Sequence, residues 1–443
     1  MKMSNRLQEK IGKIPDYAFL GVLLTICLLY RIYYFCFLHP GMVLYNSDSV
    51  SYFVFIDILQ GIVDPYRTPL YPYVIKLFEY LSRENLVGNL IGFQQVISFS
   101  SVIPFYYVSK SMIRNQYVVI AATLFYGLWH PILIQNVNLN PECLCFAGSI
   151  LYLFVLVKYL EKPAMVRAAL LGILPFFLIM LKPTYFILLF VTLVFLMYRF
   201  YLLREERKIL YWGMIGLIIS SLGVLGYCEM NKRQNGQFVL SNIALNNTLF
   251  HVSYSGAFRN GGDEEFVAII EAKRHLGSYY TVPFTINNDF IDRYQNYHKR
   301  FPQYLPPTQD MIECLNFPDT PNYPPERIQR FINQSRLTKV YSKYMAERAF
   351  DIVVGAYGNL FILFFLQSIM MVFAFLKYRK IAWAQGFCLL FILGQFFSIW
   401  LVGLDDMDRH LIPSYPFIIL IGGAFLSALA SFLKKENCID AVV

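Results

Sequence analysis

The chain has 443 residues, of which 57% are hydrophobic, 17% aromatic and only 15% charged, and its formal net charge is +9. With a mean hydropathy of +0.46, this composition excludes an ordinary soluble domain, in which about 25% of residues are charged. The positive charge does not indicate nucleic acid binding, because the basic residues are spread over short connections rather than gathered in one patch. The composition predicts a chain that lies mostly in lipid.

Apolar segments long enough to cross a bilayer follow one another along most of the chain. A hydrocarbon core of about 30 Å requires about 20 apolar residues in a helix, and about ten segments meet this requirement. The first segment is too long for a signal peptide and has no small-residue cleavage site, so we expect a retained helix. The class is therefore an all-α polytopic membrane protein. The expected spans are 17–39, 87–109, 116–135, 143–160, 164–181, 184–203, 208–228, 352–376, 381–403 and 411–433.

Lysine and arginine residues recur in every second connection between these spans. Several precede the first span, and Lys434 and Lys435 follow the last. Because positively charged connections remain in the cytoplasm, this pattern predicts that both termini are cytoplasmic. The remaining connections, called outer connections below, then lie on the extracytoplasmic face.

The first outer connection places charged and aromatic residues directly after the first span, in YNSDSVSYFVFIDILQGIVDPYRTPLYPYV. Two of its segments, 49–60 and 70–82, have apolar residues on one helical face and are predicted to be interfacial helices. We expect Asp48 at the membrane–water boundary, where desolvation raises the pKa of a carboxyl group unless a cation such as Arg67 compensates. The structural alternative is that Asp48 caps a helix and Arg67 extends toward the headgroups.

Two later outer connections each carry one charged residue near the membrane. Glu142 is the acidic residue in HPILIQNVNLNPECL, and Lys182 is the basic residue in MLKPTY. Glu142 is expected either to orient a substrate or to hold Arg67 or Lys182, while Lys182 either has a role in binding or only marks a helix boundary. Arg31 lies inside the first span, where a charge is costly, and it either serves a function or pairs with a neighbouring helix.

A long polar region, 229–350, interrupts the apolar segments. It is too charged to span lipid and too aromatic for a disordered linker, so we predict a small folded extracytoplasmic cap of α or α+β structure. Its last part, 325–350, has apolar residues at helical spacing and is expected to run as an amphipathic helix into the next span. The predicted divisions are an N-terminal transmembrane module, 1–228, with its first outer connection at 40–86, then the cap, then the C-terminal helices 351–443.

Residues that commonly bind metals or cofactors are few. Among the eight cysteines, only Cys228 and Cys314 border the cap, and a disulfide between them stays one alternative. The stretch GLDDMDRH (403–410) supplies three aspartates but no closed site, so we expect no metal, with a divalent cation as the alternative. The sequence has no Walker loop, Rossmann glycine pattern or nucleophile elbow, and we therefore expect no cofactor and no nucleotide-sugar donor.

The first outer connection resembles a signature of the GT-C superfamily of membrane glycosyltransferases. That signature, D-S-x-x-Y followed by R-x-P-x-Y-P, reads DSVSY (48–52) and RTPLYP (67–72) in this chain. The likeness is nearest to bacterial relatives of the protein mannosyltransferases and of the aminoarabinose transferase that modifies lipid A. Weaker likenesses occur in DRHLIPSYPFIIL (408–420) and in the second outer connection, where Pro141 stands in place of the serine that commonly precedes Glu142.

The resemblance implies an inverting glycosyltransferase of the bacterial inner membrane whose active site faces outward. Such an enzyme moves a sugar, a hexose or a pentose, from a polyprenyl phosphate to a lipid, glycan or protein acceptor, and its other partners are membrane lipids rather than nucleic acid. The implied catalytic base is Asp48. Cations suit a departing phosphate, and the implied donor phosphate-binding residues are Arg67, Lys182, Arg409 and His410. The residues expected to contact the acceptor or to support the others are Glu142, Tyr52 and Tyr71.

Two other classes of function remain as alternatives. A transporter or flippase of lipid-linked sugars would also place arginine and tyrosine at the ends of its helices, although such proteins commonly have two related halves with broken helices. A polymerase or ligase of polyprenyl-linked glycans would use the same kind of donor. Convergence of Asp48 and the outer cations on one interfacial cavity with a lipid-sized groove favours the transferase, whereas scattered positions would remove its main support.

Overall fold

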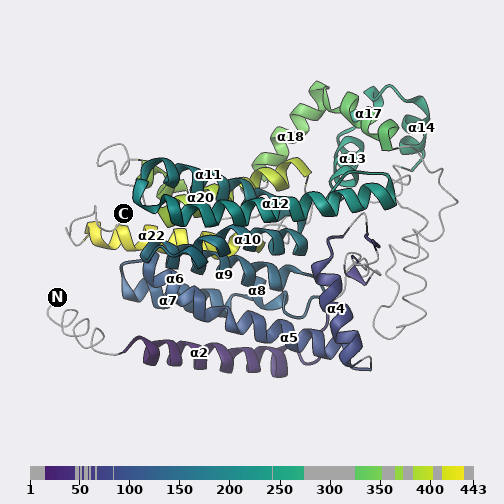
Figure 1. The fold of residues 1–443 in the computed structure, drawn as a ribbon. Coiled ribbons are helices and arrows are strands. Elements are labelled where there is room, and N and C mark those ends of the chain that lie inside the picture. The colour runs from purple at the N-terminus through teal and green to yellow at the C-terminus, as the bar shows by residue number, and fades with distance from the viewer. Residues whose placement is uncertain are drawn as a thin grey trace.

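The computed structural model describes residues 15–44, 49, 52–53, 58, 61–64, 67–82, 84–241, 243–273, 325–351, 365–372, 383–402 and 412–433. The regular structure in these ranges is helical, apart from isolated β-bridge residues such as Leu44 and Asn138. Long helices lie side by side and form a bundle (Figure 1). The protein is thus an all-α, multi-pass membrane protein, as the composition predicted.

Within the described ranges, seven helical segments are long and apolar enough to cross a bilayer. These are α2–η1 (Asp16–Tyr33 and Tyr34–Leu38), α5–α6 (Leu86–Ser100 and Val102–Met112), α7–α8 (Gln116–Leu128 and His130–Ile134), α9 (Glu142–Glu161), η3–α11 (Pro183–Tyr185 and Phe186–Leu202), η4–α12 (Arg204–Glu206 and Arg207–Asn235) and α20 (Trp383–Val402). Shorter apolar helices are α10 (Met165–Leu181) and α22 (Tyr415–Leu433), which follows η10 (Ile412–Ser414). The expected span 352–376 lies mostly outside the described residues.

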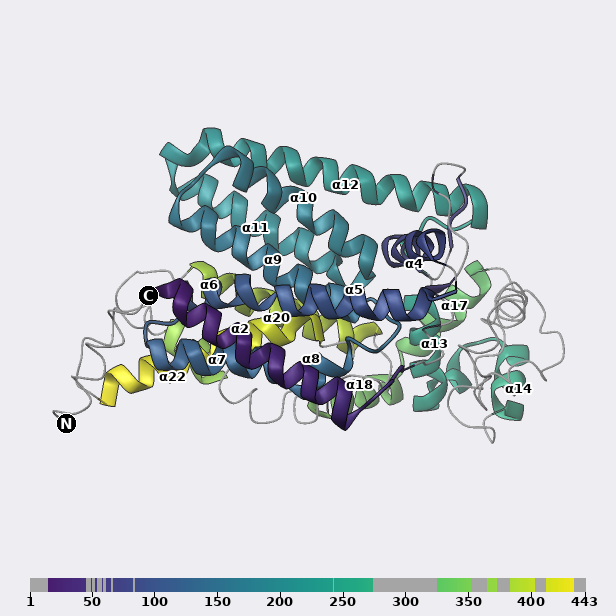
Figure 2. The same ribbon diagram turned by 90° about the horizontal axis from the view of Figure 1, so that it is seen from below.

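The bundle has two ends, which we name the Asp16 end, where α2 begins, and the α4 end. Helix α4 (Leu70–Leu81) runs across its end of the bundle in Figure 1 and is seen nearly end-on in Figure 2. Its buried side chains include Tyr71 and Ile75, while Leu77 and Tyr80 are exposed. This orientation agrees with the interfacial helix predicted over 70–82, whereas its predicted companion over 49–60 lies largely outside the described residues.

Helices α10 and α12 approach each other very closely because glycines line their contact. A Cβ atom on Gly172 would overlap the carbonyl oxygen of Gly213, and one on Gly216 would overlap the backbone of α10. The Ser220 hydroxyl donates to the Gly172 carbonyl at 2.6 Å. Small residues allow helix backbones in lipid to pack at short range, so α12 is held firmly along α10.

Arg31 is buried in α2 and pairs with neighbouring helices, which was one of its two predicted roles. Its Nη1 donates to Ser98 Oγ at 3.0 Å, and its Nη2 donates to the carbonyl of Gly127 at 3.4 Å. That carbonyl has no helical donor, because the residue four positions later is Pro131, which lacks an N–H group. Arg31 supplies the missing donor where α7 gives way to α8.

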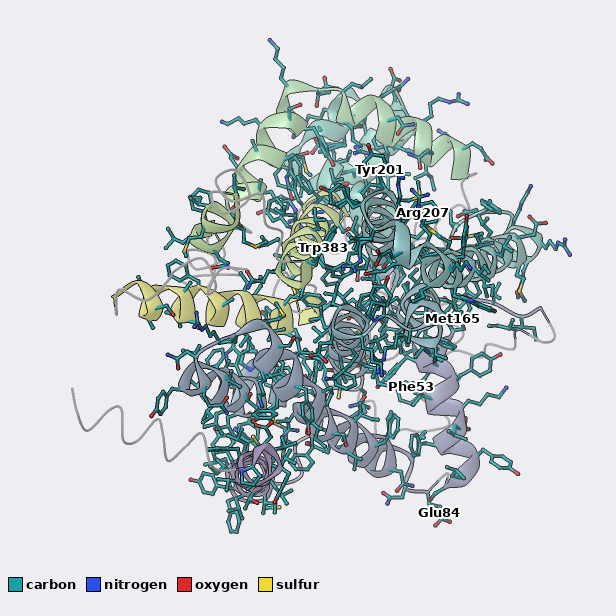
Figure 3. The ribbon with its side chains drawn as sticks, turned by 60° about the vertical axis from the view of Figure 1, so that its left-hand side comes forward. Phe53, Glu84, Met165, Tyr201, Arg207 and Trp383 are labelled. Carbon is teal, nitrogen blue, oxygen red and sulfur yellow. The ribbon has the colours of Figure 1, made fainter. Side chains whose placement is uncertain are left out.

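At the Asp16 end, a buried arginine fixes the turn between α11 and α12. Arg199 Nη2 lies 2.6 Å from Glu206 Oε1, and Tyr159 donates to the same carboxylate at 2.8 Å. The guanidinium carbon lies 5.1 Å from the ring centroid of Trp383. Figure 3 labels Trp383 together with Tyr201 and Arg207, which come from this end of the bundle.

The cap is represented by α13 (Ile243–Ser255), η5 (Ala257–Asn260), α14 (Glu264–Lys273), α17 (Pro325–Arg336) and α18 (Lys339–Asp351). They enclose a second hydrophobic core that includes Phe258, Phe266 and Phe331. The segment 325–350 is two helices rather than the single predicted one. The chain turns after α17, and Thr338 Oγ1 accepts from the N–H of Tyr341 at 3.2 Å, which starts α18.

Candidate active site

The structure describes five of the eight site residues that the sequence suggested. These five residues belong to segments at the α4 end of the bundle; they are Arg67, Tyr52, Tyr71, Glu142 and Lys182. The remaining three, Asp48, Arg409 and His410, lie outside the described residues, as do the three aspartates of 403–410.

The first and second outer connections are joined directly. Leu44 forms a parallel β-bridge with Asn138, with its N–H donating to the Val137 carbonyl at 2.9 Å. Ser49 Oγ donates to Asn140 Oδ1 at 3.2 Å, and both side chains are buried. Leu44 and Ser49, which flank 45–48 in the chain, are thus both attached to the residues just before Glu142.

Gln94 connects α4, α5 and the second outer connection, and its role was not foreseen. Its Oε1 accepts from the Tyr71 hydroxyl at 2.8 Å, while its Nε2 donates to the carbonyls of Asn136 and Asn138, each at 3.0 Å. The side chain is fully buried. The sequence signal was present, since a glutamine within an apolar span is costly unless it has partners, but nothing in the sequence names those partners.

Glu142 and Lys182 form a buried ion pair across two helix ends. Lys182 Nζ donates to Glu142 Oε1 at 3.0 Å, and the side chains are 7% and 3% exposed for the lysine and the glutamate. Glu142 opens α9 and Lys182 follows the last residue of α10. A carboxylate at a helix N-terminus and an ammonium at a C-terminus are each stabilised by the helix dipole, so both charges are placed favourably before they meet.

Arg67 stacks on Tyr52, which in turn contacts Tyr71 of α4. Its guanidinium carbon lies 4.6 Å from the ring centroid of Tyr52, and Nη1 lies 3.5 Å from the Tyr52 hydroxyl. The Tyr52 ring meets that of Tyr71 edge to face, with centroids 5.3 Å apart. A stack of this kind orients the planar guanidinium group. Because Tyr71 also binds Gln94, the arginine is linked through two rings to the second outer connection.

The pKa of Tyr71 reflects the burial of its hydroxyl group between α4 and α5. Burial raises the pKa of the Tyr71 hydroxyl well above its usual value, and negative charge on neighbouring groups, Glu142 among them, adds to the increase. The phenol therefore stays protonated and serves as a hydrogen-bond donor rather than as a base. It positions Gln94 and supports Tyr52.

No group of three or more histidine, cysteine, aspartate or glutamate side chains suited to a metal ion occurs in the described part of the chain. Cys228 is buried at the α4 end of α12, and Cys314, its suggested disulfide partner, lies outside the described residues. Within the described residues, the α4 end thus brings together a stacked arginine, a neutralised ion pair and a network of amides. Of these groups, the guanidinium of Arg67 is of a kind that donates hydrogen bonds to anionic groups.

No family model matches the chain. No curated protein matches it either. Among solved structures, similarity is found to the oligosaccharyltransferase of Archaeoglobus fulgidus in a complex with Zn and sulfate, with 13% identity and a TM-score of 0.45 over 95% of this chain and 50% of that one.

Two further structures from the same organism show the same level of similarity. One is the archaeal oligosaccharyltransferase AglB in complex with an inhibitory peptide and a dolichol-phosphate, at 13% identity and a TM-score of 0.44, covering 95% of this chain and 52% of that one. The other is the enzyme tethered to an acceptor peptide containing the NVT sequon, at 13% identity and a TM-score of 0.46, covering 96% and 52%. The chain spans about half the length of these proteins.

Proposed function

We propose that the protein is an inverting glycosyltransferase of the GT-C type that transfers a sugar from a polyprenyl phosphate to an acceptor on the extracytoplasmic face. The observation that carries the proposal is the convergence of three outer connections at the α4 end. Arg67, Tyr52 and Tyr71 come from the segment with the DSxxY and RxPxYP motifs, and Glu142 and Lys182 join them from elsewhere in the chain. A lipid-linked donor presents its phosphate at this level of a membrane protein, because its tail occupies the bilayer.

In the proposed reaction, the acceptor hydroxyl attacks the anomeric carbon while the bond between that carbon and the phosphate oxygen breaks. Asp48 accepts the hydroxyl proton, and the polyprenyl phosphate leaves with the electron pair of the broken bond. Arg67 donates to the phosphate oxygens, on which negative charge increases in the transition state. The edge of the guanidinium group suits this role, since its face is already stacked on Tyr52.

Lys182 receives a narrower role than the sequence suggested. Its ammonium already donates to Glu142, and both groups are buried. We therefore propose that the pair holds the second outer connection in place and adds positive potential from behind the site, rather than binding the donor phosphate as an isolated cation. Arg409 and His410, which follow α20 in the sequence, stay candidates for binding the donor phosphate.

The proposal is tested by measuring transfer of labelled sugar from a polyprenyl-phosphate donor pool in membranes that contain the wild type, Asp48→Asn or Asp16→Asn at matched protein levels. Asp16→Asn is the control, because this aspartate binds Lys110 at the opposite end of the bundle. We expect Asp48→Asn to reduce transfer by about 100-fold or more, as loss of a general base does, and Asp16→Asn to retain it. Transfer at the wild-type rate in Asp48→Asn refutes the mechanism, and movement of the intact lipid-linked sugar without transfer indicates a flippase.

A further inference from the structure

The turn that carries Arg67 is held from behind by the end of α12. The Tyr227 hydroxyl lies 3.0 Å from the carbonyl oxygen of Arg67 and 3.3 Å from that of Asp64, so its single proton is shared between the two ends of the turn. Tyr227 is 3% exposed, and it lies 160 residues from Arg67 in the chain. A buried hydroxyl on α12 thus contacts the carbonyl groups at both ends of the turn.

Two more contacts complete the attachment. Gln234 Oε1 accepts from the N–H of Val63 at 2.6 Å, just before the turn. Within the turn, Asp64 Oδ1 accepts from the N–H of Arg67 at 2.8 Å. The first contact anchors the turn to α12, and the second gives the turn its own shape.

The same face of α12 also holds the start of the cap region. Tyr227, Asn231 and Gln234 follow helical spacing and therefore lie on one side of the helix. Asn231 is fully buried, and its Nδ2 donates to the carbonyl of Val239 at 2.9 Å. Since α12 is itself locked to α10 by their glycine contact, this face is a rigid support for segments on both sides of the candidate site.

We infer that Tyr227 and Gln234 are positioning residues for Arg67: they fix the backbone of its turn so that the guanidinium group meets the donor phosphate. The kinetic part of this inference rests on the proposed function, whereas the structural part does not. Neither side chain touches the reacting atoms. Their effect is transmitted through the carbonyl groups of the turn and through the N–H of Val63.

The test compares Tyr227→Phe and Gln234→Ala with Tyr211→Phe in the purified full-length protein. Tyr211 is the matched control, because it lies on the same helix at the Asp16 end and is 56% exposed. Hydrogen–deuterium exchange of the peptide covering 61–69 reports the turn without requiring activity. We expect exchange about fivefold faster in the first two variants, as the loss of one hydrogen bond produces, and no change in Tyr211→Phe.

The second readout is the steady-state kinetics of each variant, with KM and kcat determined separately for a polyprenyl-phosphate sugar. Because Arg67 contacts the donor phosphate before as well as during the reaction, its misplacement raises KM by about fivefold, whereas general misfolding lowers the active fraction and leaves KM unchanged. Gln234→Ala keeps the test decisive if Tyr227→Phe folds poorly, since this glutamine is at the exposed end of α12.

The outcomes separate the inference from the function. Exchange at the wild-type rate in both variants overturns the positioning role, whatever the enzyme does. Faster exchange with an unchanged KM in an active enzyme overturns the link to the donor. If the wild type transfers no sugar, the proposed function fails, and the exchange rates still decide whether α12 holds the turn.

Discussion

Breaking the Glu142–Lys182 pair is the most direct test of the site architecture. The two charged atoms are 3.0 Å apart, and both side chains are less than a tenth exposed. With an effective dielectric constant of about 20, two unit charges at this distance attract by about 5 kcal/mol, which is partly offset by the desolvation of both groups. Lys182→Met leaves a buried carboxylate without its ammonium partner, and we expect a loss of about 3–5 kcal/mol in the free energy of unfolding.

Removing both charges should lower the free energy of unfolding by much less than the sum of the two single substitutions. Glu142→Gln combined with Lys182→Met replaces the ions by neutral groups of similar volume, and such replacements of buried pairs are often nearly neutral. The assay is a double-mutant cycle on unfolding in detergent, followed by the thermal midpoint and by a denaturant titration. A coupling energy below about 0.5 kcal/mol would mean that the two residues do not interact, and the arrangement described here would be wrong.

The remaining predictions concern the network, the arginine and the cap. Gln94→Leu removes two donor contacts and the acceptor for Tyr71, so the free energy of unfolding should fall by about 2–4 kcal/mol, and a midpoint equal to that of the wild type would contradict the network. Arg67→Lys keeps the charge but loses the stacked planar fork, and we expect the donor KM to rise about tenfold; an unchanged KM would exclude a bidentate contact with phosphate. In the cap, the hydrogen bonds from Arg327 hold the pKa of Asp263 below its ordinary value. The ionised Asp263 therefore stabilises the folded cap. This stabilisation is complete above the ordinary pKa, of about 3.9, and is lost as the pH falls through the lower pKa of the folded state. Asp263→Asn should remove this acid dependence, measured by hydrogen exchange in α14 and α17 between pH 5 and 3, and an identical pH profile in the variant would refute the assignment.

The composition determined the class of the protein, and the positions of its apolar segments determined most of its helices. In lipid the backbone must satisfy its own hydrogen bonds, so an apolar segment of sufficient length becomes a helix whatever its neighbours are. This is why spans such as α9 and α11 lie within a few residues of their predicted bounds. The interfacial helix α4 was predictable for a related reason, because its apolar residues already follow a helical period.

The sequence also indicated which residue types matter, but it left their partners open. Glu142 was expected to orient a substrate or to hold Arg67 or Lys182, and only the packing of α9 beside α10 showed that Lys182 is its partner. The break between α17 and α18 was missed, since apolar spacing continues through it while the polar cap at Thr338 decides where the second helix begins.

Tyr227 and Gln94 attracted no prediction, because a polar group in an apolar helix indicates that it needs partners but does not indicate which ones. Their partners lie 160 and 42 to 44 residues away, and which of many distant carbonyls each one meets depends on how the helices pack. Helix formation in a membrane is a local consequence of solvent and composition. The site depends on contacts between distant segments, which only the tertiary structure brings together.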